Sequence, residues 1–290
     1  MHEPDPEFAR RRLLERLDTL LDDAPPLVPL DESRFLETHV LYEGRSDQQR
    51  RIIDWFAQRI DPPRGTYRVL SVGCGSGILD VPVAASLAQS VGELDYVGVD
   101  PNQVECDAFV RRFEQAELPQ TAELTVAAST FEAFTDARGF DLVHLVHCMY
   151  YLPDPASALR RARSFLRPGG QLVLVHAPCE ALNDLAIRFY DKGYGRPTLF
   201  ADDCAALMDG LEWAYDRSRI EARVDVTPLV GGDPEVALAL RDFIVQFDSL
   251  QLAPELQSLV DRYLALISAP SPEGPVFIDH PVDVFVIGES

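Results

Sequence analysis

Five short apolar runs, separated by stretches of helical periodicity, constrain the fold of this chain more than any other feature. The runs are rich in β-branched residues and stay apolar at successive positions, which is typical of strands buried on both faces. This alternation of strand and helix predicts a parallel sheet covered by helices on both sides. We expect strands at 68–72, 95–99, 124–128, 141–146 and 171–176, and helices at about 78–90, 103–117 and 155–166.

Further segments flank this alternation. Apolar residues at helical spacing predict helices at 8–23 and about 46–60, with a proline cluster ending the first one. Beyond the alternation, strands near 212–226 and 282–287 enclose helical material at 233–266. We therefore predict an α/β fold with a Rossmann-like, doubly wound, mostly parallel seven-stranded sheet and helical cap segments.

Charge and composition exclude several classes of function. The net charge of −21 repels phosphate backbones, so we expect no nucleic-acid partner. The chain has no run of 18 apolar residues, and its first residues are too charged for a signal peptide, so we expect no membrane association. Five scattered cysteines without C-x-x-C spacing favour a reduced cytoplasm and no metal site. We expect a cytoplasmic monomer or weak homodimer.

The loop "SVGCGSG" (71–77) joins the first expected strand to a helix and has glycine at every second position. Glycine tolerates positive φ and lets the backbone approach a ligand. The G-x-G-x-G spacing differs from the G-x-G-x-x-G of dinucleotide-binding loops, and no P-loop lysine follows. The loop therefore predicts a ligand contact of another kind, with a tight turn that binds nothing as the structural alternative.

Two more features bear on this ligand. Asp100 ends the second expected strand in "VGVDPN", where a carboxylate accepts hydrogen bonds from both hydroxyls of a ribose. Asp100 alternatively caps the helix at 103–117, with Pro101 at the first helical position, and both roles are compatible. In "LRPGGQLVLV" (166–175), a helix is expected to end at a P-G-G turn directly before the fifth strand.

The glycine loop, the acidic strand end and the P-G-G turn together resemble class I S-adenosylmethionine-dependent methyltransferases over about residues 60–180. The resemblance implies S-adenosylmethionine as cofactor and S-adenosylhomocysteine as product. That family usually has Asp or Glu two residues before the first glycine, near the methionine ammonium. Ser71 stands there, so the ammonium contact must be weaker or come from elsewhere. The cofactor-binding residues implied are Gly73, Cys74, Gly75, Gly77, Asp100, Pro101, Glu105, Ser129, Thr130 and Val146.

A second resemblance, to the histamine N-methyltransferases, is carried by "DLVHLVHCMYYLPDPASALR" (141–160), "KGYGRP" (192–197), "ADDCAALMDGLEWAYD" (201–216) and "VFIDHPVDVFVIGE" (276–289). It implies that Glu43, in "LYEGRS", is a substrate-binding residue whose carboxylate holds a cationic amine. His147 and His280 stand where that family has a glutamine and an asparagine, so polar contacts are kept while donors and acceptors change. Tyr150, with its neighbour Tyr151, would supply an aromatic wall.

These resemblances divide the chain by role. Residues 1–60 are a helical segment and lid, 61–230 the cofactor-binding domain, 231–275 a helical substrate-binding insertion, and 276–290 a final strand. We expect the methyl acceptor to meet a lid at 35–45, a floor at 147–151 and a far wall around His280 and 233–266.

The leading hypothesis is N-methylation of a small amine or imidazole-type molecule. One alternative is an O-methyltransferase of a natural-product pathway, with His147 or His280 as general base. Another is a non-catalytic methyltransferase-like scaffold, which the serine at position 71 favours.

Overall fold

The computed structural model describes residues 5–195, 198–272 and 274–288, and the chain divides into two compact units. The first comprises Met1–Gln48, Pro178–Thr198 and Glu221–Pro281, and the second Gln49–Ala177, Leu199–Ile220 and Val282–Ser290. Residues 178–198 and 221–230, which the sequence places with the cofactor-binding domain, cluster with the N-terminal helices. Arg196 and Pro197 of the "KGYGRP" stretch lie outside the described residues.

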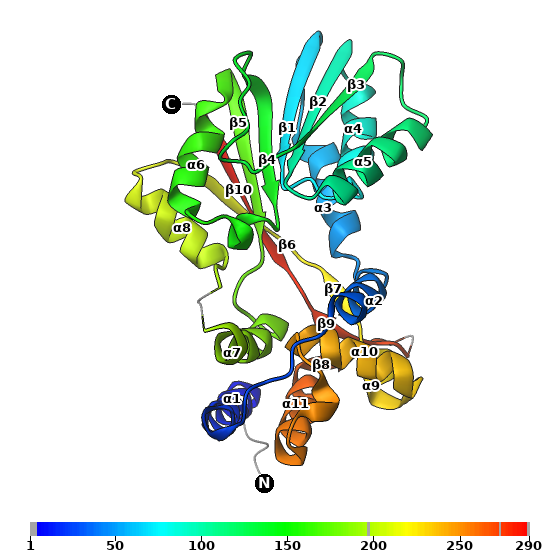
Figure 1. Ribbon diagram of the computed structural model, residues 1–290, viewed down its shortest axis with the longest axis vertical. Helices are drawn as coiled ribbons and strands as arrows, with labels where there is room; N and C mark the ends of the chain where they lie inside the picture. Colours follow the sequence, from blue (N-terminus) through cyan, green and yellow to red (C-terminus); the bar gives the residue numbers. More distant parts are fainter. Residues whose placement is uncertain (1–4, 196–197, 273, 289–290) are drawn as a thin grey trace. The chain divides into compact units, whose positions relative to one another are not determined.

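The second unit contains a seven-stranded sheet with the strand order β3-β2-β1-β4-β5-β10-β6 (Figure 1). The first five strands of the chain pair in parallel, and β10 is antiparallel to both of its neighbours. The predicted fold class, a doubly wound and mostly parallel seven-stranded sheet, is confirmed. The strands are β1 (Thr66–Val72), β2 (Glu93–Asp100), β3 (Ala122–Ala128), β4 (Phe140–Val146), β5 (Leu166–His176), β6 (Asp216–Ile220) and β10 (Val282–Gly288).

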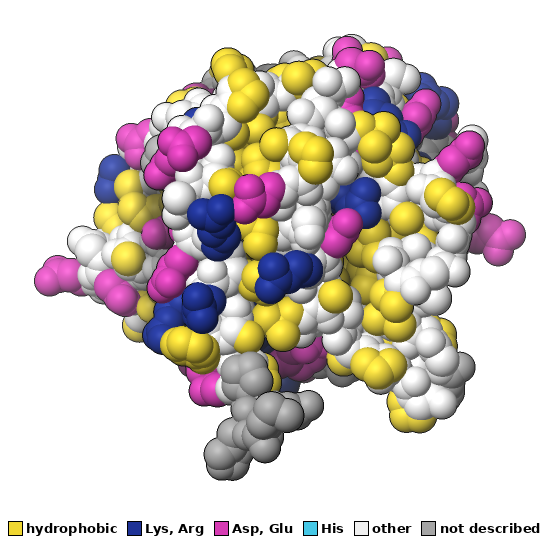
Figure 2. Space-filling model, turned by 90° about the horizontal axis from the view of Figure 1, so that it is seen from below, with side chains coloured by type: hydrophobic (Ala, Val, Ile, Leu, Met, Phe, Trp, Pro, Cys, Tyr) yellow, Lys and Arg dark blue, Asp and Glu magenta, His cyan; other side chains and the backbone are white. Residues whose placement is uncertain are grey.

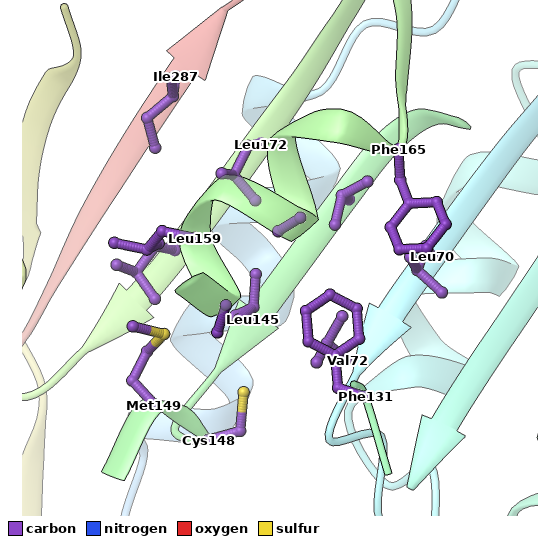
Figure 3. Packing of buried hydrophobic residues seen from close by; sticks show 14 of the residues in the cluster. Leu70, Val72, Phe131, Leu145, Cys148, Met149, Leu159, Phe165, Leu172 and Ile287 are labelled. Atoms are coloured by element: carbon purple, nitrogen blue, oxygen red, sulfur yellow. The ribbon is translucent and has the colours of Figure 1, made fainter. Parts of the chain in front are cut away.

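Helices cover both faces of this sheet, which explains the unbroken apolar runs. Val69 packs on one face, with residues of α3 (Gln48–Arg59), α4 (Asp80–Ala88) and α5 (Gln103–Gln115). Its neighbour Leu70 packs on the other face, with residues of α6 (Pro155–Ser164), α8 (Ala201–Gly210) and the short η1 (Met149–Tyr151) (Figure 3). Because successive side chains of a strand point to opposite faces, both must be apolar here. Each fully buried aliphatic side chain stabilises the fold by roughly 1.5–3 kcal/mol.

The strand register brings the carboxyl ends of the central strands together. Val72 of β1 pairs with Val99 of β2 and lies beside Leu145 of β4. The loops that follow these three strands therefore leave the sheet at one edge, where open parallel sheets bind their ligands.

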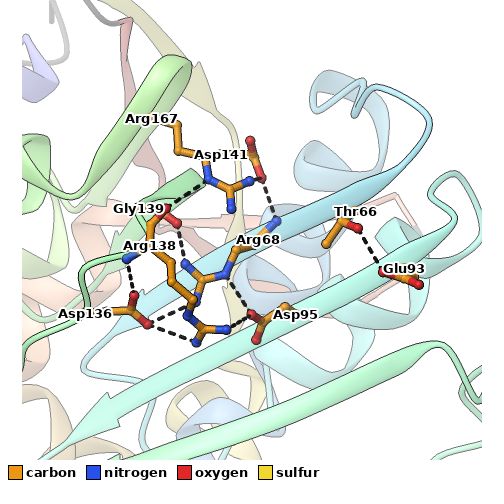
Figure 4. A network of polar contacts seen from close by, with 9 residues as sticks. All are labelled: Thr66, Arg68, Glu93, Asp95, Asp136, Arg138, Gly139, Asp141 and Arg167. Carbon is orange, nitrogen blue, oxygen red and sulfur yellow. Dashed lines mark hydrogen bonds and ion pairs between the residues drawn. The ribbon is translucent and has the colours of Figure 1, made fainter.

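A buried arginine ties the strands together nearer their amino ends (Figure 4). Arg68 of β1 is 2% exposed, and its guanidinium donates to Asp95 Oδ2 at 2.7 Å and Asp136 Oδ2 at 3.0 Å. It also donates to the Gly139 carbonyl and lies over the Phe140 ring at 4.4 Å. Two carboxylates and a ring thus compensate the desolvation of this charge.

The first unit is built mainly from helices around a separate core that includes Leu17, Phe189, Leu240 and Tyr263. A three-stranded antiparallel sheet, in the order β7-β9-β8, belongs to the same unit. Its elements are α1 (Pro6–Asp23), α2 (Glu32–Glu43), α7 (Leu182–Tyr194), β7 (Arg223–Asp225), α9 (Thr227–Gly231), α10 (Pro234–Val245), η2 (Ser249–Gln251), α11 (Pro254–Ile267), β8 (Ser268–Pro270) and β9 (Val276–Asp279).

Two expected strands are divided in the structure. The run at 276–290 breaks at His280 and Pro281 into β9 and β10, which belong to different sheets. The segment near 212–226 likewise forms β6 in one sheet and β7 in the other. Proline cannot donate to a ladder, so Pro281 is a natural place for the first break.

The face of the molecule drawn in Figure 2 has charged side chains of both signs. Basic side chains are interspersed with acidic and apolar ones on the face drawn in Figure 2, so no continuous basic surface covers it. None of the described helices combines the length and the apolar character needed to cross a bilayer.

Candidate functional site

The glycine loop uses its three glycines for different reasons. Gly73, Gly75 and Gly77 have φ of 69°, 50° and 70°, in the left-handed region that favours glycine. A Cβ on Gly73 would lie 2.6 Å from Cys148 Cβ, and one on Gly77 would lie 2.0 Å from the Phe109 ring. A Cβ on Gly75 would meet no atom closer than 4.0 Å. The outer glycines are thus required by packing, and the space over Gly75 is open to a ligand.

Asp100 fixes this loop from the end of β2. Its Oδ2 accepts from the Gly75 amide at 3.1 Å, and its Oδ1 accepts from the Asn102 amide at 2.9 Å. Each carboxylate oxygen keeps acceptor capacity for a hydroxyl group. The cap of α5 is Asn102, whose side chain accepts from the Val104 amide at 3.0 Å. Asp100 as the helix cap is therefore wrong, and Pro101 precedes the helix instead of occupying its first position.

The remaining predicted cofactor residues lie around the same edge. Ser129 follows β3, and its amide donates to the Asp100 carbonyl at 3.0 Å. Its hydroxyl oxygen is buried and has no hydrogen-bond partner within the described residues. Glu105 lies in the first turn of α5 and directs Oε2 toward Gly75. Thr130 follows Ser129 on the exposed side, and Val146 ends β4. The space over Gly75, the acceptor capacity of the Asp100 carboxylate and the Ser129 hydroxyl, which lacks a partner among the described residues, fit the expected cofactor.

Asp80, the first residue of α4, is a site residue that could not be predicted from the sequence. Asp80 is 3% exposed and accepts hydrogen bonds from the Ser71 hydroxyl and from the Tyr96 hydroxyl, the latter at 2.9 Å. Burial raises the pKa of its carboxyl to about 6, although both hydrogen bonds act in the opposite direction. Its charge also contributes to the raised pKa of the buried Cys74 thiol, which therefore stays protonated. The only signal in the sequence was the unusual serine at position 71.

His147 follows β4 and adopts φ of 50°, which is uncommon for a residue with a Cβ. Its amide continues the ladder by donating to the Val175 carbonyl at 3.1 Å. Burial, with a smaller effect of His176, lowers the pKa of the His147 imidazole to about 3. The predicted site residue is therefore a neutral imidazole at the carboxyl edge of the sheet.

His176, the last residue of β5, is a second histidine here that the sequence analysis missed. Its Nε2 lies 2.9 Å from the Leu199 carbonyl oxygen, which only accepts, so Nε2 carries the proton. Nδ1 is then a buried lone-pair acceptor with no partner among the described residues. The Tyr150 ring lies 4.8 Å from the His176 ring, and the His147 ring lies 6.4 Å from it. Burial lowers the pKa of His176 to about 4.

Glu43 and His280 belong to the first unit. Glu43 ends α2, 3.8 Å from His39 Nε2, and burial raises the pKa of its carboxyl while His39 opposes this. Gln48 Nε2 donates to the His280 carbonyl at 2.7 Å and lies 3.2 Å from His280 Nδ1. Because an amide nitrogen only donates, Nδ1 accepts and Nε2 carries the proton of the neutral ring. Tyr42 donates to the same Nδ1 at 2.9 Å.

The predicted lid at 35–45 lies mostly on α2, which is held within the first unit. Tyr42 is 4% exposed, and its ring lies 4.5 Å from the Phe243 ring of α10. The preceding α1 also buries Leu14, Leu17 and Leu21 in the core of this unit. The segment predicted as a lid is therefore part of the packed core of the first unit.

Three features together define an S-adenosylmethionine-dependent methyltransferase. They are a doubly wound sheet in which β10 is antiparallel to its neighbours, a G-x-G-x-G loop after β1, and an acidic residue at the end of β2. A family profile described as a methyltransferase domain matches residues 43–223, more than half of the chain. The chain belongs to this methyltransferase family, and its cofactor is S-adenosylmethionine.

Individual relatives are more distant. Histamine N-methyltransferase A of Xenopus laevis is 22% identical over 295 residues, covering 89% of this chain and 96% of that protein. A ubiquinone biosynthesis O-methyltransferase of Xanthomonas axonopodis pv. citri is 29% identical over 122 residues, 42% of this chain. The match spans about half of that relative, 47% of its length. The YcgJ protein of Bacillus subtilis has a similar fold, with a TM-score of 0.53 at 14% identity, covering 82% of this chain and 98% of that one.

Proposed function

We propose that this methyltransferase transfers the methyl group to nitrogen, on a small amine or imidazole-type molecule. The observation that carries the proposal is the state of the histidines at the sheet edge. Burial lowers the pKa of His147 to about 3 and that of His176 to about 4, so both are weak bases. A free amine or imidazole nitrogen brings its own lone pair, whereas a phenol must first lose a proton to a base of suitable pKa.

The cofactor supplies a methyl group on a positively charged sulfur, which is displaced in line by the nucleophile. The protein has to hold the nucleophile at the right distance and exclude water. In our proposal, the backbone at Gly75 and the carboxylate of Asp100 hold the nucleoside part of the cofactor. The His176 Nδ1 accepts a hydrogen bond from the N–H of the methyl acceptor, and the Tyr150 ring packs against it.

Glu43, His147 and His280 remain predictions as acceptor-binding residues. For Glu43 the support is the sequence resemblance and a carboxylate at the end of α2. For His280 the support is its tautomer, which the Gln48 amide fixes and which makes Nε2–H a hydrogen-bond donor. The same tautomer argues against His280 as a general base. Relatives that methylate nitrogen and relatives that methylate oxygen both occur, so the family alone does not choose between the two.

The test is a screen of amines, imidazoles and phenols with methyl-labelled S-adenosylmethionine, read by mass spectrometry. We expect a labelled N-methyl product from at least one amine or imidazole and none from the phenols. A labelled methyl ether would refute N-methylation and support the O-methyltransferase alternative. Calorimetric binding of S-adenosylhomocysteine, without any product across the panel, would support the scaffold alternative.

A further inference from the structure

A buried carboxylate lies next to the glycine loop, and no side-chain cation of the described residues neutralises it. The Tyr96 hydroxyl donates to Asp80 Oδ1, because an ionised carboxylate only accepts. The Tyr96 oxygen in turn accepts from His144 Nε2 at 2.8 Å. The proton of the His144 ring is therefore on Nε2, and burial lowers the pKa of this ring to about 3. In this hydrogen-bond network, the His144 ring and the Tyr96 hydroxyl are neutral, and the Asp80 carboxylate is the charged group.

The charge balance at Asp80 is incomplete. The basic group within ion-pair distance is His144 Nε2 at 3.7 Å, which is neutral, and residues 5–195, 198–272 and 274–288 offer Asp80 no lysine or arginine partner. An ionised carboxylate buried to 3% exposure is costly unless a positive group faces it. Hydroxyl donors reduce this cost without removing it. A cationic ligand group would complete the site.

Asp80 is placed where such a group would arrive. It begins α4, three residues after Gly77, and its hydrogen-bond partner Ser71 comes two residues before Gly73. Burial is the main cause of the raised pKa of the Cys74 and Cys148 thiols, and the negative charge of Asp80 adds to it in both. The carboxylate thus lies beside the position from which the family's usual acidic residue acts, although it comes from the next helix.

We propose that Asp80 supplies the negative charge that neutralises the α-ammonium group of the cofactor's methionine moiety, in place of an acidic residue at position 71. Ser71 and Tyr96 are positioning residues that orient the carboxylate. The inference rests on S-adenosylmethionine as cofactor and is independent of whether nitrogen or oxygen is methylated.

The test compares two ligands that share the adenosine part. S-adenosylhomocysteine carries the amino-acid group, whereas 5′-methylthioadenosine lacks it. In calorimetry, Asp80→Asn should weaken S-adenosylhomocysteine at least tenfold and leave 5′-methylthioadenosine within about twofold, because a charge-assisted contact is lost. The double variant Ser71→Asp with Asp80→Asn should recover most of the lost affinity. Equal weakening of both ligands, or of neither, would overturn the proposal, and so would a double variant no better than the single one.

A second measurement uses the unmodified protein, in case the variants do not fold. The titratable groups that face Asp80 are Tyr96, His144, Cys74 and, at longer range, Cys148 and Asp100. Of these, Asp80 is the one whose raised pKa lies near 6. The affinity for S-adenosylhomocysteine relative to 5′-methylthioadenosine should therefore fall several-fold as the pH drops from 7.5 to 5. A constant ratio over this range would contradict a charged Asp80 at the ammonium.

Discussion

The difference in the free energy of unfolding between the native protein and the Asp80→Asn variant should depend on pH. The pKa of this carboxyl rises from 3.8 to about 6 on folding, so the folded state binds the proton more tightly than the unfolded chain. Its contribution is fully present below the unfolded pKa, near pH 4, and is lost as the pH rises through about 6. One pKa unit corresponds to about 1.4 kcal/mol, so the stability of the native protein relative to Asp80→Asn should rise by about 2 kcal/mol between pH 7 and pH 4.

The assay is urea unfolding of both proteins at pH 7 and pH 4, followed by circular dichroism. Other groups titrate in both proteins, so their contributions cancel in the difference. At pH 7 we expect Asp80→Asn to be at least as stable as the native protein, because asparagine still accepts from Tyr96 without a buried charge. A variant destabilised by the same amount at both pH values would refute the reasoning. The expected result would mean that the chain keeps a destabilising carboxylate, which is typical of functional sites.

Three further predictions concern other parts of the second unit. Asp100→Ala should weaken S-adenosylhomocysteine binding by about 1.5–3 kcal/mol in calorimetry; Asn102→Ala, which removes only the helix cap, is the control, and affinity within twofold would make Asp100 a purely structural residue. His147→Ala should reduce turnover far more than cofactor affinity, and an equal loss of both would show a structural role. Arg68→Met should lower the free energy of unfolding by about 1–3 kcal/mol, because the carboxylates of Asp95 and Asp136 lose their buried partner but keep the exposed Arg138. Cofactor affinity of this variant should stay within twofold, and an undiminished midpoint of urea unfolding would contradict the assigned role.

The sheet could be predicted because burial on both faces leaves a direct trace in the sequence. Val69 and Leu70 face different helices, and both must be apolar, so the run is continuous. The division of the last segment left a weaker trace. Pro281 marks a candidate break in the run, but only the pairing partners show that β9 and β10 belong to two sheets.

The site could be predicted where a role depends on the position of a residue at a strand end. Asp100 is such a residue, because it ends β2. The sequence did not show whether Asp100 or Asn102 caps α5, since both side chains have the required oxygen. Asp80 and His176 could not be found in this way. Their significance comes from Tyr96 and Leu199, which are distant in the sequence and are brought close only by folding.

The unequal roles of the three loop glycines affect how this motif is interpreted in divergent relatives. Gly73 and Gly77 are fixed by close contacts with Cys148 and Phe109, so a descendant that had lost catalysis would still need them to fold. Gly75 has open space above it, so beyond the preference of its positive φ for glycine, selection for ligand binding is what would maintain it. A descendant that keeps the outer pair and carries a larger residue in the middle would have inherited the architecture without the enzyme.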